Sequence, residues 1–245
     1  MVVTAKQGKF DMNIGGLLAF TTIDFPGKLS AVIFTQGCAL RCPYCHNPDL
    51  QIKDAPTQTT WQNVLDLLSS RKGLLDGVVF SGGEPLLQND LASCAKQIRD
   101  MGFAIGLHTS GVFPDKLSEV LPFVDWIGLD IKAPFEKYAK ASGTQESFEM
   151  GKRAEQALDM ILKQGIDLEV RTTTDPRVVT PDDILKLGKL LAEKGVKTFA
   201  IQEYRPLNNG ILKEPSVEEI KAFYTDENLK NTLNGLFEHF ILRTA

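Results

Sequence analysis

Three of the four cysteines in this chain fall within eight residues. Cys38, Cys42 and Cys45 are separated by three and by two residues, whereas Cys94 lies far from them. Thiolates bind zinc, hold iron–sulfur clusters and carry out thiol–disulfide exchange. In a reducing compartment, such a group of cysteines indicates metal binding or catalysis rather than a disulfide framework.

The cysteine segment, which His46 follows, fits four kinds of site in part. Cys42-Pro-Tyr-Cys45 alone is a thiol redox motif, and Cys42-x-x-Cys45-His46 is a haem-attachment pattern. Three thiolates with His46 could make a closed tetrahedral zinc site. Three thiolates alone could hold an iron–sulfur cluster that keeps one iron open.

Two of these interpretations fit poorly. Haem attachment belongs to exported proteins, and glycines and an aspartate interrupt the first 25 residues, where a signal peptide needs an apolar segment. A redox motif leaves Cys38 without a role. A zinc site stays open as an alternative, although a closed site leaves the other polar motifs of the chain unexplained.

Short apolar runs alternate with stretches of helical period along the chain. Strands are predicted at 31–34, 77–80, 103–107, 126–131, 166–172 and 197–201. Helices are predicted at 61–70, 87–101, 148–164, 181–194, 217–223 and 229–240, with Thr180 as the N-cap of the fourth. This alternation favours an α/β fold with a parallel sheet and outer helices. Six repeats are too few for a complete eight-stranded barrel, so we expect a partial (β/α)6 barrel of parallel strands.

Polar residues follow nearly every predicted strand. In parallel α/β folds, chemistry gathers at the carboxyl ends of the strands. We therefore expect one shared face for the cysteine segment and for Ser81-Gly82-Gly83-Glu84, His108-Thr109, Asp130-Ile-Lys132 and Arg171.

The composition is that of a soluble globular protein. The chain has 245 residues, of which 43% are hydrophobic and 24% charged, enough for one large domain. Its net charge of −4 offers no positive field for a phosphate backbone, so we expect no nucleic-acid partner. No apolar run approaches the roughly 20 residues that span a bilayer, so we expect no membrane association and a cytoplasmic location.

The spacing of the three cysteines, with Tyr44 before the last, resembles the CxxxCxφC signature of the radical S-adenosylmethionine (SAM) superfamily, in which φ is aromatic. The segments 22–27, 34–38 and 45–48 are similar to the activases of glycyl-radical enzymes, most of all to those of anaerobic ribonucleoside-triphosphate reductase. The resemblance runs from about residue 14 to about residue 205. It implies a single radical SAM domain over 1–245, with an N-terminal extension over 1–28 and a C-terminal helical segment over 205–245.

The resemblance implies two cofactors, one [4Fe-4S] cluster on Cys38, Cys42 and Cys45, and SAM on the open iron. It implies reductive cleavage of SAM to a 5′-deoxyadenosyl radical, which abstracts a glycine Cα hydrogen from a partner glycyl-radical enzyme. Anaerobic ribonucleotide reductase is the favoured partner, and flavodoxin or ferredoxin the expected electron donor. No catalytic residue is implied beyond the cluster and SAM.

The resemblance also implies a set of SAM contacts. Glu84 would accept a hydrogen bond from the methionine ammonium, Lys132 would meet the carboxylate, and Arg171 would lie near the ribose and carboxylate. Asp130 and Thr109 resemble a monovalent-cation site, from which the chain departs because His108 stands where that branch has an aspartate. The full set is Tyr44, Gly82, Gly83, Glu84, Thr109, Asp130, Lys132 and Arg171, with weaker adenine contacts expected at residues 202–204.

Two other functions stay open. The approach to the first cysteine is also similar to that of 7-carboxy-7-deazaguanine synthase, a small-molecule radical SAM enzyme, although His46-Asn47-Pro48 argues against it. A non-catalytic zinc-binding module on the three cysteines and His46 is the alternative from another class. Cys94 is expected to be a buried, inert thiol of a helix.

Overall fold

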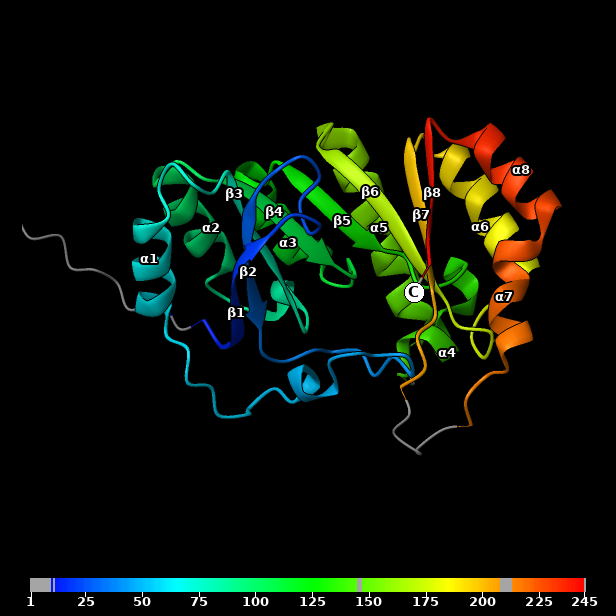
Figure 1. Ribbon diagram of the computed structural model, residues 1–245, viewed down its shortest axis with the longest axis horizontal. Coiled ribbons are helices and arrows are strands. Elements are labelled where there is room, and N and C mark those ends of the chain that lie inside the picture. Colours follow the sequence, from blue (N-terminus) through cyan, green and yellow to red (C-terminus); the bar gives the residue numbers. More distant parts are fainter. Residues whose placement is uncertain (1–9, 11, 145–146, 208–212, 245) are drawn as a thin grey trace, which may run out of the picture.

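One sheet of eight strands organises the chain, and its strands lie in sequential order (Figure 1). The computed structural model describes residues 10, 12–144, 147–207 and 213–244. The first strand pairs antiparallel with the second, and all later neighbours pair parallel. The strands are β1 (Ile14–Thr21), β2 (Ser30–Thr35), β3 (Gly77–Gly82), β4 (Ala104–Thr109), β5 (Trp126–Asp130), β6 (Asp167–Thr174), β7 (Thr198–Glu203) and β8 (His239–Arg243).

Helices connect the parallel strands. They are α1 (Trp61–Ser70), α2 (Leu91–Asp100), α3 (Pro114–Val120), α4 (Tyr138–Ser142), α5 (Ser147–Gln164), α6 (Pro181–Glu193), α7 (Val217–Thr225) and α8 (Glu227–Leu236). Short 3-10 turns cover Pro48–Gln51, Pro85–Leu87, Leu121–Phe123 and Phe135–Lys137. The six predicted strands correspond to β2–β7, so the predicted α/β fold with a parallel sheet is confirmed. The sheet is open, as a partial barrel requires.

Both edges of the sheet differ from the prediction. The predicted helix over 229–240 is wrong at its end, because α8 stops at Leu236 and residues His239–Arg243 form β8 along β7. The strand β1 lies within the predicted N-terminal extension and was not predicted. Its sequence contains a glycine pair, and its side chains are only partly buried, so it lacks the continuous apolar run of the inner strands.

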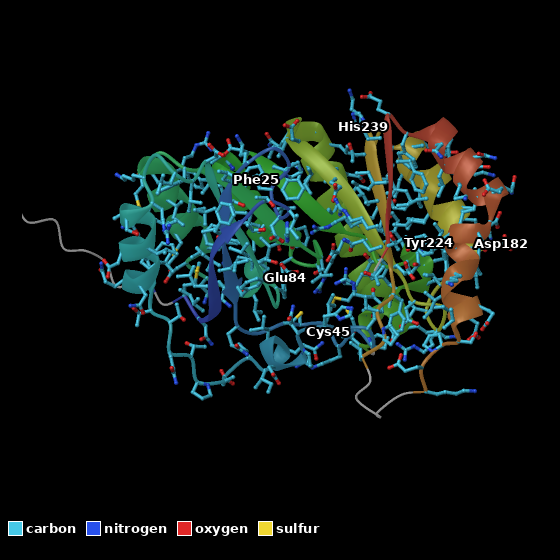
Figure 2. The ribbon with its side chains drawn as sticks, in the orientation of Figure 1. Phe25, Cys45, Glu84, Asp182, Tyr224 and His239 are labelled. Atoms are coloured by element: carbon cyan, nitrogen blue, oxygen red, sulfur yellow. The ribbon has the colours of Figure 1, made fainter. Side chains whose placement is uncertain are left out.

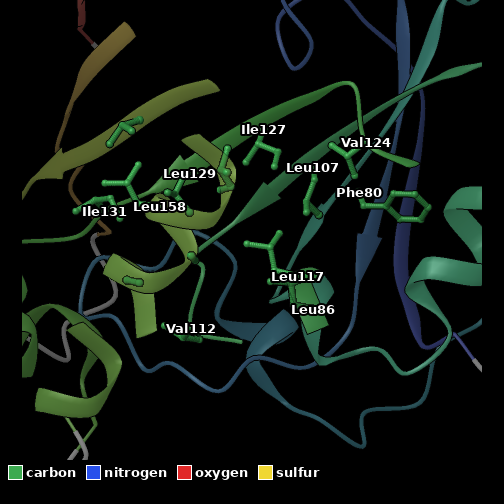
Figure 3. Packing of buried hydrophobic residues seen from close by; sticks show 14 of the residues in the cluster. Phe80, Leu86, Leu107, Val112, Leu117, Val124, Ile127, Leu129, Ile131 and Leu158 are labelled. Carbon is green, nitrogen blue, oxygen red and sulfur yellow. The ribbon is translucent and has the colours of Figure 1, made fainter. Parts of the chain in front are cut away.

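The two faces of the sheet carry different side chains. Successive residues of a strand point to opposite faces, so alternate positions share one environment. One set packs beneath the helices in the main core, where Phe80, Leu107, Ile127 and Leu129 come from neighbouring strands (Figure 3). The other set lies on what we call the inner face, away from that core.

The start of α6 follows the prediction. Thr180 is its N-cap and accepts a hydrogen bond from the Asp183 N–H at 3.2 Å, while the Asp183 carboxylate accepts one from the Thr180 N–H. Pro181 occupies the first turn, where no intrahelical N–H bond is lost.

Replacing this cap should weaken the fold. We expect Thr180→Ala to lower the free energy of unfolding by about 1 kcal/mol, because the N–H of Asp183 loses its acceptor. Urea denaturation monitored by circular dichroism measures it. Thr22→Ala, at an exposed position between β1 and β2, is the control; equal effects of the two changes would contradict the capping role.

Candidate active site

The predicted site residues meet on one side of the sheet, towards the carboxyl ends of its parallel strands. The cysteine segment follows β2, and the Gly82–Glu84, Thr109 and Asp130–Lys132 positions lie at the carboxyl ends of β3, β4 and β5. Arg171 lies within β6 and is the register partner of Asp130. Figure 2 shows Glu84 and Cys45 towards this side, whereas His239, at the start of β8, lies at the opposite one. The parallel register of the strands therefore places the predicted residues together.

Backbone contacts with α4 hold the cysteine loop in place. The Arg41 N–H donates to the Ser142 carbonyl at 2.7 Å, and the Arg41 guanidinium donates to the Cys38 carbonyl at 2.8 Å. Gly143 has φ +64°, and a Cβ there would lie 1.9 Å from the Arg41 carbonyl oxygen. Only glycine permits this approach of α4 to the loop.

The three clustered thiols are half-buried and depend on charged neighbours. Burial and the nearby Glu84 carboxylate raise the pKa of Cys38 to about 12. Burial also raises the pKa of Cys42, against the opposing effect of Lys132. Thiolates at these positions need a bound cationic centre, and binding such a centre displaces their protons.

The arrangement of these cysteines fits a cluster better than a single metal ion. Among the residues that the structure describes, no three His, Cys, Asp or Glu side chains converge as ligands of one ion. A zinc ion requires such convergence, whereas a cubane takes each thiolate on a different iron. His46 is largely exposed, and its partial burial together with the charge of Arg205 lowers its pKa. The residues present thus fit a [4Fe-4S] cluster on Cys38, Cys42 and Cys45.

Glu84 is a buried carboxylate, 1% exposed, that joins the ends of β3 and β4. Its Oε1 accepts hydrogen bonds from the Thr109 hydroxyl at 2.6 Å and the Leu86 N–H at 3.1 Å. Its Oε2 accepts from the N–H and hydroxyl of Ser110 at 2.9 and 2.5 Å. These four donors occupy the roughly four acceptor positions of a carboxylate. Ser110 was not predicted, because a serine after a strand carries no distinctive pattern.

Gly82 and Gly83 allow two backbones to touch. Gly82 has φ +109°, and a Cβ on Gly83 would lie 2.1 Å from the Gly37 carbonyl oxygen. The family resemblance implies that both glycines contact SAM. The structure shows that they are required for the approach of β3 to the loop that follows β2.

Asp130 lies between two cations at the end of β5. Arg171 Nε is 3.1 Å and Lys132 Nζ 3.9 Å from its carboxylate oxygens. Burial acts to raise the pKa of Asp130, but the charges of Arg171 and Lys132 outweigh it and lower the pKa. Burial acts to lower the pKa of Lys132, but Cys42, Tyr44 and Asp130 raise it well above its usual value.

The side chains expected to bind a monovalent cation are already partnered. Asp130 is paired with Arg171 and Lys132, and the Thr109 hydroxyl donates to Glu84. Burial and Arg171 lower the pKa of His108 to about 3, so this position supplies a neutral imidazole in place of a carboxylate. These residues do not fit a cation site.

Tyr44 packs against the C-terminal part of the fold, beside Tyr204 and Ile220. Lys132 Nζ lies 5.9 Å from the centre of its ring. The Tyr44 hydroxyl is buried, and no described residue hydrogen-bonds to it. The Tyr204 hydroxyl donates to Glu214, and its ring lies beneath the Arg177 guanidinium at 4.8 Å; the adenine contact expected near this residue stays a prediction. A buried hydroxyl without a partner beside a lysine is compatible with a bound polar ligand.

The chain matches a known family and its relatives. A sequence model described as the radical SAM superfamily matches residues 32–174. A glycyl-radical enzyme activating enzyme of Methanocaldococcus jannaschii is 31% identical over 242 residues, which cover 92% of this chain and 98% of the relative. The pyruvate formate-lyase-activating enzyme of Staphylococcus aureus is 31% identical over 242 residues, covering 86% and 93%.

Solved structures share the fold at low sequence identity. A radical SAM methyltransferase from Sphaerobacter thermophilus has a TM-score of 0.67 at 16% identity, over 92% of this chain and 68% of that chain. Streptococcus suis SuiB bound to S-adenosylmethionine has a TM-score of 0.62 at 13% identity, over 85% and 45%. At this sequence identity, these two matches establish the fold of the chain but not its substrate or partner.

Removing the Glu84 carboxylate should destabilise the protein before any ligand is considered. We expect Glu84→Ala to lower the free energy of unfolding by about 3 kcal/mol, because the buried donors of Thr109 and Ser110 lose their acceptor. Urea denaturation of the protein without cofactors measures it. Glu119→Ala, on an exposed face of α3, is the control and should change stability by less than about 0.5 kcal/mol. Equal stability of both variants would show that the Glu84 hydrogen bonds contribute little.

Proposed function

The chain belongs to the radical SAM superfamily, and we propose that it activates a glycyl-radical enzyme, with anaerobic ribonucleotide reductase as the first candidate partner. It is an enzyme whose cofactors are one [4Fe-4S] cluster and SAM. When bound, these supply one-electron cleavage of SAM and a radical that takes hydrogen from a glycine Cα of the partner. The protein's task is to bind, orient and shield them.

The observation that carries this proposal is the full-length likeness to activating enzymes combined with one geometric fact. The M. jannaschii relative aligns over 98% of its own length, so no domain of that protein is missing from this chain. The geometric fact is the placement of the Lys132 ammonium, which lies 5.9 Å from the centre of the Tyr44 ring, the residue before Cys45. A cation next to a cluster ligand is suited to hold the carboxylate of an amino-acid ligand.

We assign the ligand contacts within this proposal as follows. Cys38, Cys42 and Cys45 hold the cluster, and Lys132 meets the SAM carboxylate. Arg171, which also pairs with Asp130, orients that end of the site. Tyr44, Gly82, Gly83 and Thr109 line the ligand. Glu84 would have to exchange one of its four donors to accept from the ammonium, so we assign it chiefly to positioning Thr109 and Ser110.

The electron for this reaction must enter through the cysteine loop. That loop is half-buried, and the cationic side chains of Arg41 and Arg205 are exposed near it. We propose flavodoxin or ferredoxin as the donor, since both are acidic one-electron carriers and a basic rim favours their approach. We also propose a cytoplasmic location. None of the helices in the described part of the chain has the length and apolarity to cross a bilayer.

The cluster assignment is tested by a matched pair of cysteine changes. We expect Cys42→Ala to lose iron, labile sulfide and all SAM cleavage, because one iron loses its thiolate ligand. Cys94→Ala removes a buried thiol in α2 and should keep all three. Iron and sulfide analysis after anaerobic reconstitution, with 5′-deoxyadenosine assayed by chromatography, measures both. About four irons per chain support the cubane; stoichiometric zinc without sulfide would overturn it.

The partner assignment is tested by electron paramagnetic resonance. We expect a glycine-centred doublet when the reconstituted protein, SAM and reductant are incubated anaerobically with anaerobic ribonucleotide reductase. Pyruvate formate-lyase is the comparison partner, and the Cys42→Ala variant the negative control. A doublet only in pyruvate formate-lyase would keep the activase function and change the partner. SAM cleavage without a doublet in any glycyl-radical enzyme would favour a small-molecule substrate.

A further inference from the structure

The hairpin between β1 and β2, residues 22–29, places a phenylalanine on the inner face of the sheet. Phe25 is 3% exposed, and its ring stacks on Trp126 of β5 with centroids 5.7 Å apart. Val32 and Val79 complete the contact, and the four side chains form an apolar cluster separate from the main core. We call this cluster the floor.

Glycines on two strands make room for the floor. A Cβ on Gly77 would lie 3.0 Å from the Phe25 ring, and a Cβ on Gly106 would lie 3.2 Å from it. These distances are too short for an undisturbed side chain at either position. The strands β3 and β4 are therefore shaped to receive Phe25.

The floor borders a cavity through Trp126 and borders the site through the contact of Trp126 with His108. A cavity of about 930 Å³, lined by Pro26, Trp126 and the starts of β6 to β8, opens on one side of it. On the other side, Val79 is followed two positions later by Ser81, and Gly106 by His108, on the same face of the same strands. The side chains of Ser81, His108 and Arg171, which we call the polar layer, thus continue the inner face beyond the floor.

His108 joins the hairpin to this polar layer. Its Nε2 lies 2.9 Å from the Asp24 carbonyl oxygen, and its Nδ1 lies 3.3 Å from the Ser81 hydroxyl. A carbonyl only accepts, so Nε2 carries the proton, and Nδ1 accepts from Ser81. The imidazole and Trp126 rings also make an edge-to-face contact, with their centroids 5.5 Å apart. The His108 imidazole therefore hydrogen-bonds to the hairpin at Asp24 and to Ser81 at the end of β3, and it contacts Trp126 of the floor.

We propose that the β1–β2 hairpin seals the active site against the cavity beneath the floor, and that His108 is the positioning residue that holds this seal closed. The inference rests on the proposed function, because the reactive species of radical SAM chemistry must be kept from solvent and small hydrogen donors. His108 acts through the hairpin and through Ser81.

Hydrogen–deuterium exchange on the purified full chain tests the holding role. We expect His108→Leu to speed exchange of the amides in residues 22–29 about tenfold, because the hairpin loses its bond to the sheet. His108→Gln should restore protection, since its amide can donate to Asp24 while its carbonyl accepts from Ser81. His239→Leu, on another wall of the same cavity, is the control. Unchanged exchange in His108→Leu would overturn the role of His108.

Fluorescence quenching tests the seal without any activity. In a Trp61→Phe background, Trp126 is the remaining tryptophan. We expect Phe25→Ala and His108→Leu to raise acrylamide quenching of Trp126 at least about twofold, because the ring that covers it is removed or released. Phe20→Ala, at a 53% exposed position of β1, is the matched control. Equal quenching in Phe25→Ala and Phe20→Ala would overturn the seal.

The reconstituted enzyme gives the functional readout. We expect Phe25→Ala to release at least about twice as much 5′-deoxyadenosine per glycyl radical formed, because the unsealed site loses its hydrogen-abstracting species to small donors. An unchanged ratio would overturn the sealing function even if the hairpin were loosened. Absence of a glycyl radical in every partner would count against the proposed function, while exchange and quenching still decide the seal.

Discussion

The site depends on one close approach between two backbones, at the ends of β2 and β3. The N–H of Gly83 donates to the Thr35 carbonyl, and the N–H of Glu84 to the Gly37 carbonyl, both at 2.9 Å. Any side chain at position 83 would collide with Gly37. Cys38 follows Gly37 directly, so this contact sets the first cysteine beside Glu84. The Glu84 carboxylate then fixes the end of β4 by accepting hydrogen bonds from Thr109 and Ser110.

Two cations of the site, Arg171 and Lys132, are arranged around this frame at the ends of the strands. Arg171 and Lys132 share the single carboxylate of Asp130, while Glu84 is satisfied by neutral donors. Buried charges are stable only when paired or solvated. The Lys132 ammonium lies 3.9 Å from a carboxylate oxygen of Asp130 and 5.9 Å from the centre of the Tyr44 ring, which precedes the last cysteine in the sequence. Thiolates bound to a metal cluster and the carboxylate of an amino-acid ligand are both anions that would complete this arrangement.

Parts of this structure could be predicted from the sequence because they depend on local pattern. The strands β2–β7 are short apolar runs bounded by turn residues, and α6 begins with Thr180 and Pro181, which favour a helix start by themselves. The edges β1 and β8 could not be predicted, since each is defined by pairing with a neighbour rather than by its own composition. The link from Ser110 to Glu84 spans 26 residues and exists only through the register of β3 and β4. The grouping of the site residues was predictable because parallel strands end on one side.

The role of the hairpin follows from the geometry of an unclosed barrel. A closed eight-stranded barrel fills its interior with its own side chains, because strands on opposite walls face each other. Here the sheet is open, because β1 and β8 at its two edges do not pair with each other. Leaving Val79 and Trp126 uncovered would expose apolar surface, and filling the space with large side chains from the strands would block the site above. A separate segment must therefore cover the starts of the strands, and Phe25 does so while glycines keep the strands clear for it. The Asp-Phe-Pro-Gly turn is in this sense part of the barrel wall, placed there because the sheet does not close.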